Sequence, residues 1–332
     1  MKKKIKSLLI CNSNMFIPTV LTEVLNNQQE SFLVISDTRS ITKFFEFISI
    51  PNVDFIEYGQ LEGHFDFFSK KRQLLKALGR YDIGEVVFFH AEFGEMANWL
   101  IKRLSSDVPI KYCKLYDSIP CPRCRKWLTV AKIKLKQYLY WGIKMDVLEY
   151  PYPFPSIPKK FFKDVKAETI TMPIENVKVS NVVSRRMTEI KLVGKFVLLT
   201  GTVVHDGFYT ADIYTKYINN VITSLDIKNI ISKCHPRYKD LYGLEKELPQ
   251  IPSFIPGNVL INNYDYYVGF ESTLLVEVAV AGKIAISLID LFPTNEELRK
   301  KTHDFFDNRL QGRGKILFPK TIEELKAILN LL

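Results

Sequence analysis

The sequence predicts an α/β protein with two domains, each a parallel sheet wound on both faces by helices. Short, β-rich apolar runs alternate with helical patterns in the first part of the chain, and the same alternation starts again near residue 195. A proline-rich stretch separates the two series. Strand and helix alternating at such spacing are typical of a parallel sheet with both faces covered.

The first series contains five apolar runs that are expected to form strands. They are SLLIC (7–11), FLVIS (32–36), VDFIE (53–57), EVVFFH (85–90) and KYCKLY (111–116). The helical patterns between them are MFIPTVLTEVLNN, TKFFEFI, SKKRQLLKALGR and GEMANWLIKRL. The unbroken apolar character of EVVFFH suits a strand buried on both faces. These elements form a predicted first domain over residues 1–150, which is expected to bind the acceptor of a transfer reaction.

A linker is expected after the first series. The stretch EYPYPFPSIPKK, residues 149–160, contains Pro151, Pro153, Pro155 and Pro158. Proline removes a backbone donor and disrupts helices, so the chain is expected to be extended here. Residues 151–192 are therefore predicted to be a proline-rich linker followed by an irregular connection.

The second series predicts a second domain over residues 193–332. Its strands are KFVLLTG, NIISKCH, NVLIN, YYVGF and KIAISLI, its helices are TADIYTKYINNVITSL and STLLVEVAVAG, and TIEELKAILNLL closes the chain as a docking helix. Two Rossmann-like domains place a ligand in a cleft between the carboxyl ends of both sheets. By analogy of fold, this is the architecture of the GT-B glycosyltransferases.

Composition bounds the partners. The chain has 332 residues, a net charge of +10 and a pI near 9.1, which favours anionic partners such as nucleotides, phosphates and anionic lipid. No apolar run reaches the roughly 18–20 residues of a membrane span. The apolar stretch near the start of the chain is too short to be the hydrophobic region of a signal peptide. Five scattered cysteines favour a reduced, cytoplasmic location.

The motif KCHPRYKD places His235 at the carboxyl end of a predicted strand, followed by Pro236 and Arg237. Proline ends the strand, and a histidine there points toward the ligand-binding edge of an α/β domain. Imidazole and guanidinium groups both donate hydrogen bonds to phosphate oxygens. The pattern favours an anion site, and the alternative is a capping or core histidine.

The motif GFESTLLVEVAVAG opens a helix with Ser272 and Thr273 directly after a strand. The first backbone N–H groups of such a helix, its dipole and the two hydroxyls suit an anion. Glu277 lies about 1.5 turns further on, where it reaches a ribose hydroxyl or faces solvent. Ordinary N-capping by Ser272, which needs no ligand, is the alternative.

The motif LLTGTVVHDGFYT contributes a third strand end, with Gly201 between Thr200 and Thr202. Glycine allows a ligand to approach the backbone closely, although many turns between a strand and a helix contain one. Together, the three motifs supply three polar strand ends of one domain, which predicts a nucleotide-phosphate site.

Asp117, in KLYDSIPCP, follows the fifth predicted strand of the first domain and is the expected catalytic base for an acceptor hydroxyl. An Asx-turn residue before a proline is the alternative. The CPRC pair at 121–124 lacks the further ligands that zinc needs, and no DxD motif occurs. Neither a metal nor a cofactor is therefore expected.

Residues 122–144 combine seven Lys and Arg residues with Trp and Tyr side chains and no acidic residue. This composition suits the surface of an anionic membrane or a polyanionic acceptor. The alternative is an ordinary surface helix whose long basic side chains keep their charges in water.

The HP pair, GFESTLL at a helix start and the opening SLLICNSNMFIPTVL resemble the bacterial sialyltransferases and polysialyltransferases of lipooligosaccharide and capsule. The resemblance implies that His235 contacts a CMP phosphate beside Ser272 and Thr273. That family carries an acidic motif in its first domain, and here Asp117 takes the role by position only. The HDG sequence at 205–207 looks like the family motif but lies in the second domain, where Asp206 is the next candidate base.

The resulting expectation is an inverting, metal-independent transferase that moves sialic acid or a related acidic sugar from a CMP donor to a cell-surface glycan. Asp117 and His235 are the expected catalytic residues. The enzyme would be cytoplasmic or peripheral at the inner membrane through residues 122–144, with a homodimer possible and no nucleic-acid partner. Two alternatives remain open: a teichoic-acid-type polyol-phosphate transferase with a CDP-linked donor, and a non-catalytic polyanion-binding protein.

Overall fold

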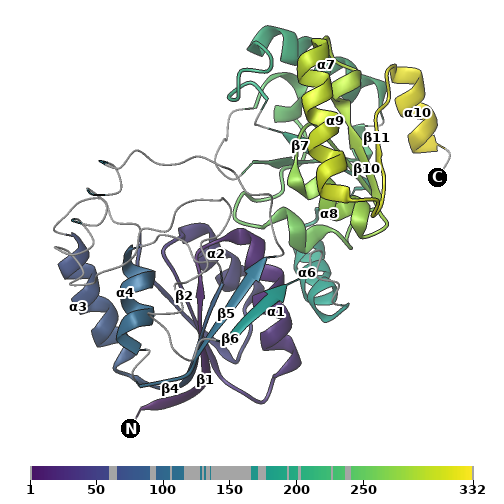
Figure 1. Ribbon diagram of the computed structural model, residues 1–332. Coiled ribbons are helices and arrows are strands. Elements are labelled where there is room, and N and C mark those ends of the chain that lie inside the picture. The colour runs from purple at the N-terminus through teal and green to yellow at the C-terminus, as the bar shows by residue number, and fades with distance from the viewer. Residues whose placement is uncertain are drawn as a thin grey trace. The chain divides into compact units, whose positions relative to one another are not determined.

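The chain divides into two compact units, Met1–Ile174 and Glu175–Leu332, and each is described by itself (Figure 1). The structure is a computed structural model. It describes residues 2–59, 66–89, 95–104, 107–115, 128, 131, 135, 166–170, 177–192, 194–200, 203–225, 227–235 and 241–330.

The first unit contains a six-stranded parallel sheet in the order β3-β2-β1-β4-β5-β6. Its strands are β1 (Lys3–Cys11), β2 (Phe32–Ser36), β3 (Val53–Glu57), β4 (Tyr81–Phe89), β5 (Ile110–Leu115) and β6 (Lys166–Ile170). This is the strand order of a Rossmann fold, in which the winding reverses between the first and fourth strands. The carboxyl ends of β1 and β4 therefore flank the position where such folds bind ligands.

Helices cover both faces of the first sheet. They are α1 (Ile17–Asn26), α2 (Arg39–Ile48), α3 (Asp66–Leu78) and α4 (Glu95–Leu104), with the short helix η1 (Asn14–Phe16) before α1. Leu74 and Leu78 of α3 and Leu100 of α4 share one core cluster with strand residues such as Leu8 and Phe88. The buried residues of α1 and α2 are not part of that cluster, as expected when right-handed crossovers run in opposite directions from β1 and β4.

The second unit contains a five-stranded parallel sheet in the order β11-β10-β9-β7-β8. Its strands are β7 (Phe196–Thr200), β8 (Ile230–Cys234), β9 (Tyr266–Gly269), β10 (Ile284–Ser287) and β11 (Ile316–Leu317). Counted within the unit, the order is 2-1-3-4-5, the other common doubly wound arrangement. The winding reverses between β7 and β9.

The helices of the second unit also lie on two faces. They are α6 (Val177–Glu189), α7 (Ala211–Ser224), α8 (Thr273–Val280), α9 (Glu296–Leu310) and α10 (Ile322–Asn330), with short helices η2 (Ile227–Asn229), η3 (Gly243–Lys246), η4 (Gly257–Leu260) and η5 (Leu288–Asp290). Buried residues of α7 and α10 join one cluster with Leu198, Ile230 and Val268 of the sheet. The α8 residues Leu275 and Val278 are buried outside that cluster, and α8 contacts α9. Two doubly wound α/β domains, predicted from the alternation of strands and helices, are thus confirmed.

Two parts of the chain differ from expectation. The range 151–192, expected to be irregular, contains β6, which extends the first sheet, and α6. The run NVLIN, expected to be a strand, is largely the short helix η4, and its residues Val259 and Leu260 are buried. A short apolar run records burial but does not distinguish a strand from another buried segment. Among the described residues, no helix is long and apolar enough to cross a membrane.

Candidate functional site

The candidate site of the second unit lies at the carboxyl ends of β7, β8 and β9. In doubly wound sheets, loops diverge to opposite faces where the winding reverses, and this leaves a crevice at the carboxyl edge. Here the reversal lies between β7, which ends at Thr200, and β9, which ends at Gly269. Three of the predicted motifs follow these strand ends, so the topology brings them to one edge of one sheet.

His235 directly follows β8 and is half-buried. Its backbone N–H donates to the carbonyl of Thr200 at 3.0 Å, which extends the pairing of β8 with β7 by one residue. The backbone of His235 is therefore fixed beside the end of the central strand. This is the position that the sequence predicted for a histidine at the ligand-binding edge.

Thr200 is buried, with 6% of its surface exposed. Its hydroxyl donates to Cys234 Sγ at 3.5 Å, across the pair formed by the last residues of β7 and β8. The side chain therefore supports the sheet, and the backbone carbonyl of Thr200 accepts from His235. Its predicted contact with a phosphate stays a prediction.

Ser272 and Thr273 open α8 directly after β9. Ser272 is the N-cap, and its hydroxyl accepts from the backbone N–H of Leu274 at 3.2 Å. The ordinary capping role considered from the sequence is therefore present. Thr273, the first helical residue, is exposed, and its backbone N–H has no acceptor within the helix. The N–H groups of Leu274 and Leu275 both donate to Ser272, so the Thr273 hydroxyl and the Thr273 backbone N–H are the groups that remain suited to an anion.

Glu277 lies four residues after Thr273 and therefore on the same side of α8. Its side chain is half-buried as a whole, but the carboxyl oxygen Oε2 is closed off from solvent and has no hydrogen-bond partner. Burial raises the pKa of this carboxyl to about 8. The group is therefore mostly neutral at pH 7, so it does not repel an anion and can donate a hydrogen bond as well as accept one.

A buried hydrogen-bond network extends inward from these strand ends. Cys234, paired with Thr200, donates through Sγ to Gln250 Oε1 at 3.8 Å, and Gln250 donates to the backbone carbonyl of Glu245 at 2.8 Å. The fully buried Glu245 carboxylate accepts from Tyr214 Oη and from the backbone N–H of Tyr242, each at 2.7 Å. Despite these donors, burial raises the pKa of Glu245 to about 7.

This raised pKa predicts a stability that depends on pH. The folded state holds a proton on Glu245 that the unfolded chain releases near its ordinary pKa of 4.5, so stability is lost as the pH rises from about 4.5 through about 7. The loss attributable to this group is at most about 3 kcal/mol. We expect urea unfolding at pH 5 and pH 8 to show a smaller difference for Glu245→Gln than for the wild type. Equal differences in the two proteins would contradict the assignment.

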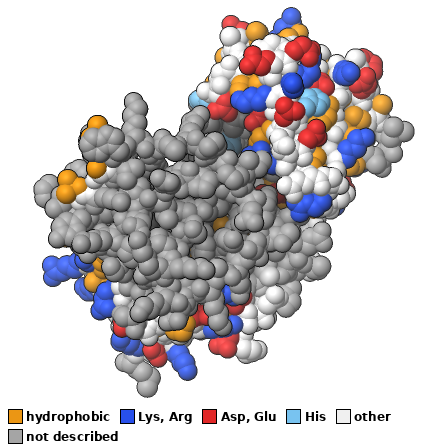
Figure 2. All heavy atoms as spheres, viewed as in Figure 1, with side chains coloured by type: hydrophobic (Ala, Val, Ile, Leu, Met, Phe, Trp, Pro, Cys, Tyr) orange, Lys and Arg blue, Asp and Glu red, His pale blue; other side chains and the backbone are white. Residues whose placement is uncertain are grey.

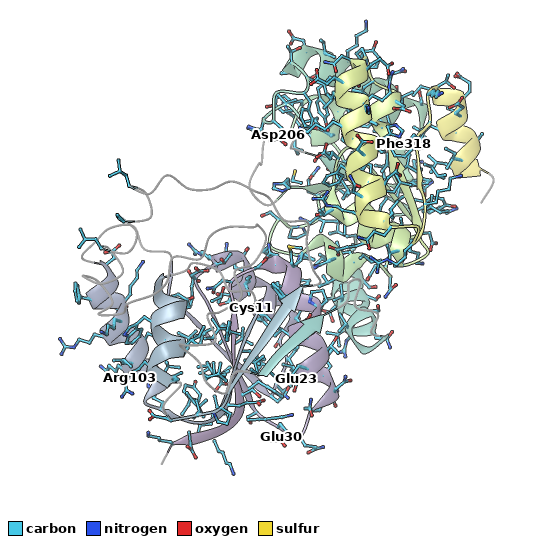
Figure 3. The ribbon with its side chains drawn as sticks, viewed as in Figure 1. Cys11, Glu23, Glu30, Arg103, Asp206 and Phe318 are labelled. Carbon is cyan, nitrogen blue, oxygen red and sulfur yellow. The ribbon has the colours of Figure 1, made fainter. Side chains whose placement is uncertain are left out.

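The first sheet carries its own polar cluster at its carboxyl edge, which the sequence analysis missed. Asn12, directly after β1, donates to Tyr58 Oη at 2.8 Å and accepts from the backbone N–H of Asp37 at 3.1 Å. The Asp37 carboxylate accepts from Thr38 Oγ1 at 2.9 Å, and burial raises its pKa. Figure 3 labels Cys11 at this end of β1. The sequence pattern that could have predicted this cluster is a polar side chain directly after each of β1, β2 and β3, namely Asn12, Asp37 and Tyr58.

Several predicted residues lie outside the described part of the chain. They are Asp117, Gly201, Thr202, Pro236 and Arg237, together with the CPRC pair and most of the basic stretch 122–144. Of that stretch, Leu128, Ala131 and Leu135 are described, and all three are exposed. The roles of these residues stay predictions.

Asp206 is described and lies in the exposed loop after β7 (Figure 3). On the visible face of the second unit, basic and acidic side chains are interspersed rather than gathered by sign (Figure 2). Within the described residues, no group of three or more His, Cys, Asp and Glu side chains is placed to hold a metal ion.

Comparison with known proteins finds similarity only at the level of structure. No protein-family model matches the chain, and no curated protein matches it in sequence. Similar solved structures include the UDP-GlcNAc 2-epimerase of Methanocaldococcus jannaschii, with 13% identity over 98% of this chain and 92% of that one and a TM-score of 0.48. The spinosyn rhamnosyltransferase SpnG, complexed with thymidine diphosphate, has 8% identity over 98% and 92% and a TM-score of 0.46. MurG of Acinetobacter baumannii has 13% identity over 99% and 90% and a TM-score of 0.38.

These findings correct the resemblance to the bacterial sialyltransferases. The similar structures are nucleotide-sugar epimerases and GT-B glycosyltransferases rather than CMP-sialyltransferases, and no sequence family supports the resemblance. The HP pair and the Ser/Thr helix start are short motifs that can arise on unrelated proteins for capping or for anion binding, so they do not identify a family. At TM-scores below 0.5 these similarities do not assign a function to the chain.

Proposed function

We propose that the chain is a glycosyltransferase that binds a nucleotide-activated sugar at the carboxyl edge of the second sheet. The observation that carries this proposal is the site at the reversal of winding between β7 and β9. There the amino terminus of α8, with Thr273 and Glu277 on one side of the helix, follows one strand, and His235 follows the strand next to β7. Backbone N–H groups, an imidazole and a neutral carboxyl form a set suited to phosphate and ribose rather than to a metal.

The reaction that this set supports is displacement at the anomeric carbon of the sugar. The acceptor oxygen forms a bond to that carbon, the bond between the carbon and the phosphate oxygen breaks, and the hydroxyl proton passes to a carboxylate base. Negative charge develops on the leaving phosphate, where the Thr273 backbone N–H, the α8 dipole and His235 stabilise it. His235, if protonated, also donates a proton to that oxygen.

Asp117, the residue predicted from the sequence, is proposed as the base. The acceptor is proposed to be a sugar hydroxyl of a cell-surface glycan, met beside a membrane through residues 122–144.

The donor is proposed to be a cytidine nucleotide sugar or another pyrimidine nucleotide sugar. A polyol-phosphate transferase with a CDP-linked donor would use the same phosphate contacts, because those contacts read the phosphate and not the group attached to it. Product analysis separates the two, since the polyol-phosphate transferase leaves a phosphodiester in its product. A protein that binds polyanions without chemistry would release no nucleotide.

The role of Glu277 tests the donor site directly. We expect the wild type to bind CMP, CDP or UDP in calorimetric titrations at pH 7, and to lose affinity above pH about 8, where the carboxyl ionises next to the phosphate. Glu277→Gln mimics the neutral carboxyl and is expected to keep the pH 7 affinity and to remove this loss. Glu277→Leu, which cannot bond a ribose hydroxyl, is expected to bind about tenfold more weakly.

Glu296→Gln serves as the matched control, because Glu296 is an exposed glutamate at the start of α9 whose carboxylate pairs with Arg299. It is expected to bind as the wild type does at both pH values. If the wild type binds no nucleotide at millimolar concentration, the proposed function is wrong. If Glu277→Leu binds as tightly as the wild type, the site lies elsewhere.

A further inference from the structure

Lys233 is a buried lysine in β8, with only 5% of its surface exposed. Its Nζ donates to the backbone carbonyl of Cys234 at 3.1 Å, so the amine lies at the carboxyl end of the strand. No carboxylate among the described residues forms an ion pair with it, whereas the lysines Lys3, Lys6 and Lys283 each pair with an acidic side chain. Within the described part of the chain, Lys233 is therefore a buried amine with one hydrogen bond, to a backbone carbonyl, and no acidic partner.

An ammonium group in this position is costly to the empty protein. Burial lowers the pKa of Lys233 to about 8, and the Cys234 thiol is the titratable group that opposes this shift. Near pH 7 most molecules still carry the charge. A buried charge that lacks a partner lowers stability, and an apolar residue of the same size would avoid that cost. An anionic ligand would supply the missing counter-charge.

The position of Lys233 in the sheet leads to the same edge as the proposed donor site. In the parallel register, Lys233 is paired with Leu199 of β7, and Leu199 lies against Gly269 of β9. Side chains alternate along β8, so Lys233 and Ile230 lie on opposite faces of the sheet. Ile230 belongs to the core cluster on the face that α7 covers. The opposite face, on which Lys233 lies, is the one toward which the crossover from β9 carries α8.

We propose that Lys233 is a phosphate-binding residue of the donor site, whose ammonium group compensates the negative charge of the nucleotide. The inference rests on the proposed function and adds a residue that opens the KCHPRYKD motif but was not among the predicted site residues. Lys233 would recognise the phosphate and not the nucleoside. Its contribution should therefore be large for a nucleoside diphosphate, smaller for a monophosphate and absent for the nucleoside.

The test compares binding with stability in Lys233→Met, which retains the length of the side chain and removes the amine. Titration calorimetry at pH 7 would compare three ligands that share one nucleoside: cytidine, its monophosphate CMP and its diphosphate CDP. Each is titrated into the wild type and into the variant. We expect affinity for CDP to fall about tenfold or more, affinity for cytidine to stay unchanged, and the unfolding midpoint of the empty protein to stay equal or rise. A lysine with a purely structural role would lower that midpoint instead.

Proton linkage gives a second readout. Because the ligand phosphate raises the pKa of a neighbouring amine, CDP binding near pH 8 should take up a proton, seen as a binding heat that depends on the ionisation enthalpy of the buffer. Lys233→Met should lose the part of this uptake that the amine provides. Lys283→Met, which removes a surface lysine paired with Asp265, should match the wild type in both affinity and proton uptake.

The outcomes separate this inference from the proposed function. If the wild type binds nucleotides and Lys233→Met binds them with the same affinity and the same ratio between diphosphate and nucleoside, the inference on Lys233 is overturned and the donor site stands. If the wild type binds neither CDP nor UDP, the proposed function fails first. An unfolding midpoint that drops by several degrees together with weaker binding of cytidine would assign Lys233 a structural role and overturn the inference.

Discussion

His235→Ala is expected to reduce turnover of the nucleotide sugar by about a hundredfold to a thousandfold, the range seen when one donor to a developing negative charge is removed. The histidine directly follows β8, and its backbone N–H is bonded to Thr200 at the end of the central strand. Charge on the leaving phosphate is greater in the transition state than in the bound donor. The loss should therefore appear mainly in kcat, and nucleotide affinity should fall much less.

The measurement is nucleotide release from the donor that the wild type turns over, followed by phosphorus NMR, with nucleotide affinity measured on the same preparations. His303→Gln is the control, because His303 lies in α9, pairs with Asp290 at 3.1 Å and stacks on Phe318. It should retain turnover, although it changes the contact with Asp290. If His235→Ala turns over the donor at the wild-type rate, His235 does not stabilise the leaving phosphate and the site assignment is wrong.

Gly314→Ala is expected to destabilise the second unit by about 3 kcal/mol or more, the sum of a strained backbone and a clash with a neighbouring helix. Gly314 has a φ of +76°, and an added Cβ would lie 2.2 Å from the carbonyl oxygen of Ala279 in α8. The obstacle is helix backbone, which cannot rotate away as a side chain can. The loop before β11 or the carboxyl end of α8 would have to move.

Gly312→Ala is a matched control two residues earlier. Gly312 has nearly the same φ, +77°, but an added Cβ there meets nothing within 4 Å. It should cost only about 1 kcal/mol, from the left-handed backbone alone. Since Trp99, Trp127 and Trp141 all belong to the first unit, far-UV circular dichroism compared with tryptophan fluorescence during urea unfolding locates the loss. Equal costs for the two variants would contradict the clash.

The alternation of apolar strands and helical patterns was sufficient to predict the two sheets, because strands covered on both faces need unbroken apolar runs. It failed where burial does not imply a strand, as at Val259 and Leu260 in η4. It also failed at β6, whose sequence KAETI is half polar. An edge strand needs less apolar surface than a central one, so its pattern is weaker.

The site was predictable only in part. Motifs directly after strands correctly placed His235 and the start of α8 at the carboxyl edge of one sheet, since the carboxyl ends of parallel strands meet at one edge; their binding role stays a prediction. Lys233 was not predicted as a site residue, because its burial depends on which face of the sheet it occupies and on what packs there. The raised pKa of Glu277 was out of reach for the same reason, since the sequence is equally consistent with a solvated glutamate.

In both units the strand that comes first in the sequence, β1 or β7, lies in the interior of its sheet, at the reversal of winding. In the second unit, β8 follows β7 in the sequence and pairs with one edge of it, whereas the strands on its other side, β9, β10 and β11, come later in the chain. A nucleotide held between the ends of β7 and β9 would contact both parts of the sheet. It would thereby connect, without a covalent bond, two segments that lie about seventy residues apart in the sequence. Such a ligand would stabilise the pairing of β7 with β9, and its release would lower the free energy needed to open the second unit between these two strands.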